Sequence, residues 1–427
     1  MNDADINMNP AAVLDAHKKS RGKLEMFPKV KVQSKADLAT YYTPGVAYVA
    51  KEISRDRSKV YDFTSKGDTI AIISDGTRLL GLGSVGAEAS MPVMEMKALL
   101  YKKYAGIDAV PLCLNTTSED EIVAIAKGVA PSFGGINIED IESPKCFEIV
   151  EKLSNTLDIP VLHDDQHGTA MVMMAALINA AKLAGKDLKS SKIVINGAGA
   201  AGLGFARILS NIGLRNVYVL DTAGLIYKGR KEHMNRFKEE IASITNPEAK
   251  SGTLEEIVEG ASVLIGASTA KVFTKDMIAK MADKPIVFAL ANPEPEISYS
   301  DAIEAGAFIA ATGRSDSPNQ VNNMFSFPAI MRGLLSARVR TVTYDLLYEA
   351  AKALAKSAGK NLSKEHILPD ASDSKQMLKA VESIAIAVAQ KGIDTGNARL
   401  NVTPQEIKEA IRQKAKAYAK IEKKLPA

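Results

Sequence analysis

A glycine-rich turn between an apolar strand and an apolar helix is the feature that most restricts how this chain can fold. The strand KIVIN leads into the turn, and the helix GLGFARIL follows it. Such a turn lets the backbone approach a pyrophosphate at the positive end of a helix. Asp221 ends the next strand, 19 residues after the last glycine of the turn, where a carboxylate binds an adenosine ribose. A tight turn without a ligand would not need that acid, so we expect a dinucleotide site. Its small residues are Gly197, Gly199, Ala200, Ala201 and Gly202.

Short apolar strands alternate with helical segments on both sides of this turn. The later strands read NVYVLD, ASVLIGAST, PIVFALANP and AFIAATGR, and the earlier ones include TIAIISDG and DAVPLCLN. This alternation predicts an α/β protein with parallel sheets. Beyond Pro328 the sequence is rich in Ala and Leu and has no strand signal. We therefore expect an N-terminal α/β substrate and metal domain, a Rossmann-type doubly wound domain and a helical C-terminal extension packed back on the cleft. Their expected ranges are 1–162, 163–340 and 341–427.

Two acidic segments, GGINIEDIESP at 134–144 and IPVLHDDQHGTA at 159–170, each place a pair of acids directly after an apolar run. Both pairs should lie at the carboxyl ends of buried strands, where α/β folds collect their chemistry. Glu139, Asp140 and one of Asp164 and Asp165 are therefore candidate metal ligands. Carboxylates alone suit Mg²⁺ or Mn²⁺ better than zinc. One such pair would more simply cap a helix or line a loop, but two pairs favour a metal.

Two histidines, His163 and His167, flank the second acidic pair. Since three carboxylates already suffice for the cation, we assign both histidines to strand and loop structure. The only cysteines are Cys113 and Cys146, which predicts neither a disulfide framework nor a thiolate metal site.

Composition excludes several classes of protein. The chain is 46% hydrophobic and 24% charged, and it has no apolar run near the roughly 18 residues that a membrane span requires. Its first residues, MNDADINMNP, lack the regions of a signal peptide, so we expect a cytoplasmic protein. The net charge of +4 comes from the last 27 residues, where seven Lys or Arg face three Glu. Without a basic face and aromatic platforms, we expect no nucleic-acid partner.

Local signals also predict individual helices. Ser118 and Thr403 each begin a capping box, and the second opens a Lys-rich surface helix. An apolar segment that ends before Gly185 reads as a buried connecting helix. The expected helices span 34–40, 92–104, 119–128, 169–183 and 404–424.

Eight motifs, in order and over nearly the whole chain, resemble those of a malic enzyme of the shorter prokaryotic type. They are YTPGVA at 42–47, LLGLGSVG with MPVMEMK at 79–97, KYAGIDAVPL, INIEDI, HDDQHGTA, the glycine-rich turn, ANPEPEI and TGRSDSPNQVNN. The resemblance implies oxidative decarboxylation of (S)-malate to pyruvate and CO₂ with reduction of NAD or NADP. It also implies a homodimer or a larger homo-oligomer, with the segment around Tyr42 contributed to the partner's site.

The resemblance further implies a role for each matching residue. Lys97 would be the general base, Tyr42 the general acid, and Asp164 would hold Lys97 by a charged hydrogen bond. The other roles are metal binding by Glu139, Asp140 and Asp165, and binding of the substrate carboxylates by Arg78, Asn292 and Asn323, with Asn292 also beside the coenzyme. Taken alone, Lys97 reads as a surface lysine, Tyr42 as a packing aromatic and Asn323 as a turn residue.

The chemistry explains why these residue types are needed. A base that removes a hydroxyl proton must be neutral near pH 7, and a nearby divalent cation in a closing cleft would lower the pKa of Lys97 enough. Two other readings compete with this one. A metal-dependent lyase could decarboxylate oxaloacetate without net redox, and a non-enzymatic protein could sense NAD. The intact turn argues against the first, and the acidic segments beside Lys97 argue against the second.

Coenzyme choice depends on Asp221, which would repel the 2′-phosphate of NADP. Lys228, Arg230 and Lys231 follow it, and we expect them to be solvated and too distant to compensate. The sequence therefore predicts a modest preference for NAD, with NADP tolerated.

Overall fold

Two parallel sheets form the framework of the molecule, which we describe from a computed structural model covering residues 9–79 and 82–425. Leu80 and Gly81, which belong to the LLGLGSVG motif, lie outside the described residues. The first sheet has the order β2-β1-β3-β4 and the second β10-β9-β8-β5-β6-β7, and only the β6–β7 pair is antiparallel. The strands are β1 Thr69–Ser74, β2 Asp108–Cys113, β3 Gly135–Ile138, β4 Val161–His163, β5 Ile193–Asn196, β6 Val217–Asp221, β7 Gly224–Leu225, β8 Val263–Gly266, β9 Ile286–Ala289 and β10 Ile309–Thr312.

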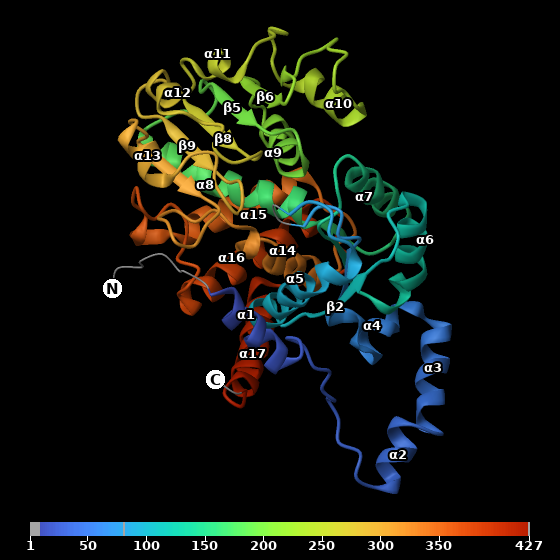
Figure 1. The fold of residues 1–427 in the computed structure, drawn as a ribbon. Coiled ribbons are helices and arrows are strands. Elements are labelled where there is room, and N and C mark those ends of the chain that lie inside the picture. The colour runs from blue at the N-terminus through green and yellow to red at the C-terminus, as the bar shows by residue number, and fades with distance from the viewer. Residues whose placement is uncertain (1–8, 80–81, 426–427) are drawn as a thin grey trace.

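Helices connect the strands and cover both sheets (Figure 1). No helix among the described residues is both long enough and apolar enough to cross a membrane. The α-helices in the first half of the chain are α1 Pro10–Ser20, α2 Lys35–Tyr41, α3 Gly45–Arg55, α4 Val60–Phe63, α5 Ala87–Leu100, α6 Glu119–Val129, α7 Lys145–Thr156 and α8 Thr169–Ala184. In the second half they are α9 Ala200–Asn211, α10 Arg236–Ile244, α11 Leu254–Val258, α12 Lys275–Ala279, α13 Tyr299–Glu304, α14 Phe327–Ala337, α15 Tyr344–Ser357, α16 Ser374–Asp394 and α17 Pro404–Glu422.

Most predicted helices are confirmed, and one boundary was wrong. The capping box at Thr403 opens α17, and Ser118 caps α6. The helix expected from Pro92 begins five residues earlier, at Ala87. Proline lacks an amide hydrogen and therefore often starts a helix, but here it lies inside α5. A π-helical segment, η3 Tyr101–Ala105, then prolongs the helix.

Helix α8 is buried along most of its length and passes between the two sheets (Figure 1). Ala and Met residues make this helix apolar on nearly every side, so it has no solvated face. It ends at Gly185, which adopts the left-handed conformation that terminates many helices. The expectation of a buried connecting helix is confirmed. The N-terminal end of α8 follows directly from the second acidic segment.

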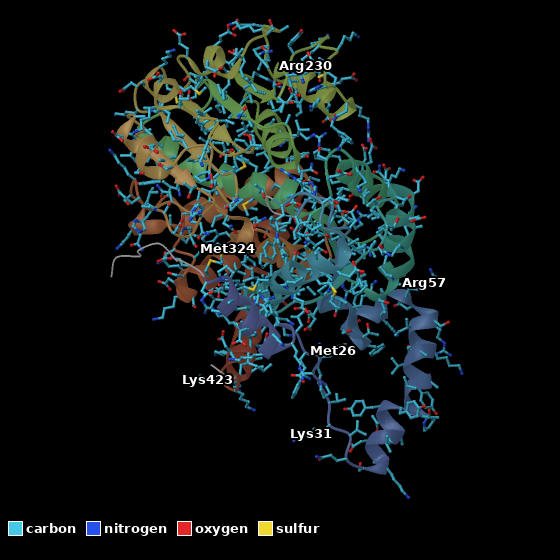
Figure 2. All side chains as sticks on the ribbon, in the orientation of Figure 1. Met26, Lys31, Arg57, Arg230, Met324 and Lys423 are labelled. Carbon is cyan, nitrogen blue, oxygen red and sulfur yellow. The ribbon has the colours of Figure 1, made fainter. Side chains whose placement is uncertain are left out.

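Helices α2 and α3 form an arm that extends away from the rest of the chain (Figure 1). Figure 2 shows Met26 and Lys31 on the connection leading to this arm. The Met26 side chain is 96% exposed, and Tyr42, between the two helices, is 68% exposed. The arm therefore presents apolar and aromatic side chains to the outside of a single chain.

The C-terminal helices pack back on the first sheet. Asp68, which precedes β1, accepts hydrogen bonds from Arg332 of α14 at 2.7 Å and from Lys414 of α17 at 2.6 Å. Both cations come from the far end of the sequence. Helices α14 and α17 thus both contact the N-terminal α/β unit. That residues 341–427 pack on the cleft stays a prediction.

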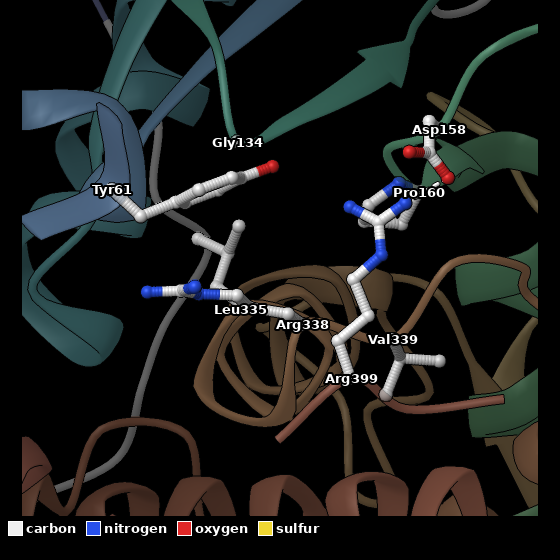
Figure 3. Close-up of a pocket in the computed structure, with 8 residues that line it drawn as sticks. All are labelled: Tyr61, Gly134, Asp158, Pro160, Leu335, Arg338, Val339 and Arg399. Atoms are coloured by element: carbon white, nitrogen blue, oxygen red, sulfur yellow. Dashed lines mark ion pairs between the residues drawn. The ribbon is translucent and has the colours of Figure 1, made fainter. Parts of the chain in front are cut away.

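Two arginines extend this contact at the amino edge of the first sheet (Figure 3). The guanidinium of Arg338 lies 4.4 Å from the ring centroid of Tyr61, and Arg399 pairs with Asp158. Arg338 ends α14 in the left-handed conformation. Arg338 thus joins the end of α14 to α4, and Arg399, whose amide donates to the Ala337 carbonyl at 3.1 Å, joins the same end to the loop before β4.

Candidate active site

Three carboxylates converge at the carboxyl edge of the first sheet, as the sequence predicted. Glu139 and Asp140 follow β3, and Asp165 lies in a π-helical segment, η5 Asp164–Gly168, that follows β4. One ligand oxygen from each lies within 4.8 Å of the others. The backbone amide of Asp140, a residue in the left-handed conformation, donates to Asp165 Oδ2 at 3.0 Å. Neighbouring parallel strands end side by side, which explains why residues 25 positions apart in sequence meet here.

The chemistry of this cluster fits a divalent cation. The Glu139 side chain is 1% exposed, and burial raises its pKa well above the usual range, so a nearby positive charge would stabilise its ionised form. Among the described residues, four buried polar atoms around the cluster have no hydrogen-bond partner: Tyr101 Oη, Asn137 Oδ1, His163 Nε2 and Asp164 Oδ1. Buried polar groups normally have partners, so this cluster is suited to bind a polar ligand. Oxygen ligands suit hard divalent cations, of which Mg²⁺ and Mn²⁺ are two.

Lys97 enters the same site from α5. Its ammonium lies 2.7 Å from Glu139 Oε1, pairs closely with Asp164 Oδ2, and sits 4.7 Å from the ring centroid of Phe327. Burial alone would lower the pKa of Lys97, but Asp164 and Glu139 outweigh burial and raise it above its ordinary value. The lowered pKa expected from the sequence depends on a divalent cation beside Lys97, so it stays a prediction.

Asp164 and Asp165 are neighbours that face different partners. Asp164 contacts Lys97, as the resemblance implied, and Asp165 joins the metal cluster. The wide turn of η5 separates the two side chains. Gly168, at the end of η5, lies so close to Asp164 Oδ1 that an added Cβ would overlap it.

The predicted substrate residues lie in two places. Arg78 is adjacent to the carboxylate cluster, since its amide donates to the Asp140 carbonyl at 3.0 Å. Asn323 opens the short helix η6 Asn323–Phe325, and its carbonyl accepts from the Ser326 amide at 2.8 Å and hydroxyl at 2.6 Å. Asn292 follows β9 in the second sheet. It therefore lies on the dinucleotide side, and its expected role toward the substrate stays a prediction.

The glycine-rich turn has the predicted conformation. It connects β5 to α9, and Gly199 precedes the first helical residue, Ala200, with Ala201 next. A Cβ at Gly197 would overlap the Ala267 carbonyl, and one at Gly202 would overlap the Gly197 carbonyl. Gly197 also has a φ of 123°, which L side chains rarely adopt. Both positions therefore require glycine.

Asp221 ends β6 as predicted, but its surroundings differ from the expectation. Arg230, expected to be solvated, is buried and donates to Asp221 Oδ1 at 2.8 Å. Lys238, which the sequence analysis missed, donates to Oδ2 at 2.6 Å, and the Ala223 amide donates to Oδ1 at 2.9 Å. Burial alone would raise the pKa of Asp221, but Arg230 and Lys238 lower it to about 2.

A surface cavity of about 390 Å³ adjoins this ion cluster. Arg230, Lys231 and Tyr227 line it. Two cations thus surround one carboxylate at the place where an adenosine ribose is expected. Nothing in the local sequence marked Lys238, because it lies 17 residues after Asp221 on a separate helix, α10.

Tyr42 does not join the other predicted residues within one chain. It lies on the projecting arm, whereas Lys97 and the carboxylates lie where α5 meets the first sheet (Figure 1). The two histidines are buried in β4 and η5, where the His163 amide donates to His167 Nδ1 at 3.2 Å. Their assignment to structure alone stays a prediction.

Sequence reasoning also missed a buried acid, Glu296, within the quoted motif ANPEPEI. Its carboxylate accepts from the amides of Ser268 and Ala291, each at 2.9 Å, and joins the loops after β8 and β9. Its burial could not be predicted, because charged residues in loops are usually exposed.

Comparisons with known proteins agree with this geometry. Residues 21–154 match the family model "Malic enzyme, N-terminal domain", and residues 166–393 match "Malic enzyme, NAD binding domain". The chain is 46% identical over 401 residues to a bifunctional malic/malolactic enzyme of Bacillus subtilis, covering 94% of this chain and 97% of that protein. It is 45% identical to an NAD-dependent malic enzyme of Geobacillus stearothermophilus, covering 90% and 79%. A malic enzyme from Pyrococcus horikoshii Ot3 superposes with a TM-score of 0.91 at 40% identity, covering 96% and 97%.

Proposed function

Because the chain belongs to the malic enzyme family, we propose that it converts (S)-malate to pyruvate and CO₂ and reduces NAD or NADP. The observation that carries this proposal is the meeting of Lys97, paired with Asp164, and the cluster of Glu139, Asp140 and Asp165. One half of the site is suited to proton removal and the other to a divalent cation. The glycine-rich turn before α9 provides for the dinucleotide.

Glu139, Asp140 and Asp165 would hold Mg²⁺ or Mn²⁺. When bound, the cation supplies positive charge that stabilises the enolate left by decarboxylation. A cation on Glu139 would also weaken that residue's attraction for the Lys97 ammonium, which favours a neutral amine.

Lys97 takes the hydroxyl proton as hydride leaves the substrate. Asp164 holds the Lys97 amine in position, and the Phe327 ring excludes water on one side. Arg78, Asn292 and Asn323 bind the substrate carboxylates. These assignments rest on the family motifs and on the positions described above.

Tyr42 would protonate the enolate from the partner subunit. Its own arm carries it away from Lys97, and its ring is exposed. The arm also exposes Tyr48, and the connection leading to it exposes Phe27, which favours association with a second copy. We therefore propose a homodimer, or a larger homo-oligomer, in which each site combines two chains.

Coenzyme choice follows from the Asp221 cluster. Arg230 and Lys238 offset the charge of Asp221, so its repulsion of a 2′-phosphate is weaker than the sequence suggested. We propose that both coenzymes are used, with a preference for NAD below about tenfold, which corresponds to about 1.4 kcal/mol.

Malate-dependent formation of reduced coenzyme tests the function. Activity should disappear with EDTA and return with Mg²⁺ or Mn²⁺. Lys97→Ala should lower turnover by about 10²- to 10⁴-fold, whereas the control Lys102→Ala, which breaks a partly exposed pair with Asp108, should retain it. Decarboxylation of oxaloacetate without malate-dependent reduction would instead identify a lyase. Full activity after exhaustive chelation would contradict the metal assignment.

A further inference from the structure

Two side chains link the carboxylate cluster to the hydroxyl of Tyr344. His163 Nε2 lies 3.6 Å from Asp165 Oδ2, and the other ring nitrogen, Nδ1, lies 3.4 Å from Gln166 Oε1. Gln166 Nε2 in turn donates to Tyr344 Oη at 2.7 Å. Tyr344 is the first residue of α15, in the C-terminal region. The metal cluster is thus connected to a residue 179 positions later in sequence than Asp165.

The same hydroxyl is reached from the dinucleotide-binding helix. Arg207 of α9 donates from Nη1 to Tyr344 Oη at 3.4 Å. Its guanidinium lies 5.5 Å from the ring centroids of both Phe147 and Phe237, and it pairs with Glu240. These contacts fix the Arg207 side chain. A displacement of α9 would therefore move the Arg207 guanidinium relative to the Tyr344 hydroxyl.

Backbone packing supports the same connection. A Cβ at Gly204, also in α9, would lie 2.7 Å from the Gln166 carbonyl, so the helix touches η5 directly. The side chains of His163 and Gln166 are 0% and 3% exposed. In such a closely packed interior, small displacements are transmitted rather than absorbed.

We propose that Tyr344 is a positioning residue that couples dinucleotide binding at the start of α9 to cation binding at Asp165. Arg207 lies seven residues after Ala200 on one continuous helix, a rise of about 10 Å. A dinucleotide held at the turn would fix α9, and through Arg207, Tyr344 and Gln166 it would hold His163 against Asp165. The cation would then bind a carboxylate that is already oriented. This inference rests on the metal site proposed above.

The test measures Mn²⁺ affinity without substrate, so turnover plays no part. Free Mn²⁺ is followed by electron paramagnetic resonance in the full-length protein, with and without saturating NAD. We expect NAD to lower the Mn²⁺ dissociation constant by roughly fivefold or more, and the reciprocal effect of Mn²⁺ on NAD binding should have the same size. Tyr344→Phe, which removes only the hydroxyl, should reduce this factor to less than about twofold.

Tyr348→Phe is the matched control, because Tyr348 lies one turn further along α15 with its ring 5.0 Å from the Lys352 ammonium. It should keep the wild-type factor. Thermal unfolding of both variants shows whether the fold is retained. The proposal is overturned if NAD does not lower the Mn²⁺ dissociation constant of the wild-type protein. It is also overturned if NAD lowers that constant by the same factor in Tyr344→Phe as in the wild type. If Mn²⁺ does not bind at all, the metal site fails and this inference fails with it, whereas binding without coupling overturns this inference alone.

Discussion

At the scale of single residues, Gly168 leaves no room for a side chain beside Asp164. A methyl group there would overlap Asp164 Oδ1, and it would also lie 2.8 Å from Ser326 Oγ. We expect Gly168→Ala to push Asp164 away from Lys97 and to lower kcat/KM for malate by about 10²-fold, as small misplacements of catalytic groups do. Steady-state kinetics measure the effect. Gly128→Ala is the control, because nothing lies within 4 Å of a Cβ there; equal activity of the two variants would contradict the prediction.

His167 makes the fold sensitive to acid. Burial, helped by the charges of His163 and Arg207, lowers its pKa to about 3, from an ordinary value of 6.5. Between these values the unfolded chain binds a proton that the folded chain does not, so stability falls as pH drops below about 6.5. His167→Asn, which keeps an acceptor for the His163 amide, should lose about 2 kcal/mol less stability than wild type between pH 7 and pH 5.

Urea unfolding at the two pH values measures this difference. His17→Asn, at an exposed position of α1, should behave as wild type. An identical loss of stability in His167→Asn and wild type would show that His167 is protonated in the folded chain. Mn²⁺ affinity of His167→Asn should stay within a few fold, since His167 is not one of the three clustered ligands.

At the scale of helices and strands, much of the fold follows from the sequence. The strand ends at Ile138, His163 and Asp221 were predictable because each apolar run stops at a polar residue. The carboxylate cluster follows from parallel pairing of those ends. The π-helical segment that contains Asp164 and Asp165 gave no signal in the sequence; in the folded chain α9 packs directly on it at Gly204. The division into 1–162, 163–340 and 341–427 stays a prediction.

Helix α10 contributes what the sequence could not reveal about coenzyme choice. Lys238 meets Asp221 only because α10 folds back beside β6. We expect Lys238→Ala to lower kcat/KM for NADP relative to NAD by roughly tenfold, the effect of one charged hydrogen bond of about 1.5 kcal/mol. Kinetics with each coenzyme at saturating malate give the ratio. Lys250→Ala, which breaks an exposed pair with Glu248, serves as the control. An unchanged ratio would mean that the 2′-phosphate lies away from Lys238.

At the scale of the whole molecule, the arm predicts that an active site needs two chains. Lys97→Ala and Tyr42→Phe should each be poorly active alone. If the acid comes from the partner subunit, unfolding and refolding them together at equal amounts should restore about a quarter of wild-type activity, since half of the dimers are mixed and each has one intact site. The position of the arm could not be predicted from sequence, because few contacts within the chain hold it and its apolar side chains are exposed.

Refolding each variant separately and mixing afterwards provides the control, which should remain inactive as long as subunits do not exchange. No recovery after joint refolding, with mixed dimers demonstrated by a tag on one variant, would place Tyr42 and Lys97 of one chain in the same site.

The contacts of Asp68 with Arg332 and Lys414, together with the Arg338 and Arg399 contacts, have a consequence during protein synthesis. The first sheet emerges early from the ribosome, but α14, whose Leu335 and Met331 pack against Gly134 and Gly135 at β3, is encoded much later. The apolar surface that α14 covers therefore stays open until then, when a nascent chain is prone to aggregate. Chaperones that shield early segments should thus raise the yield of this protein more than that of a chain whose first unit is closed by its own residues.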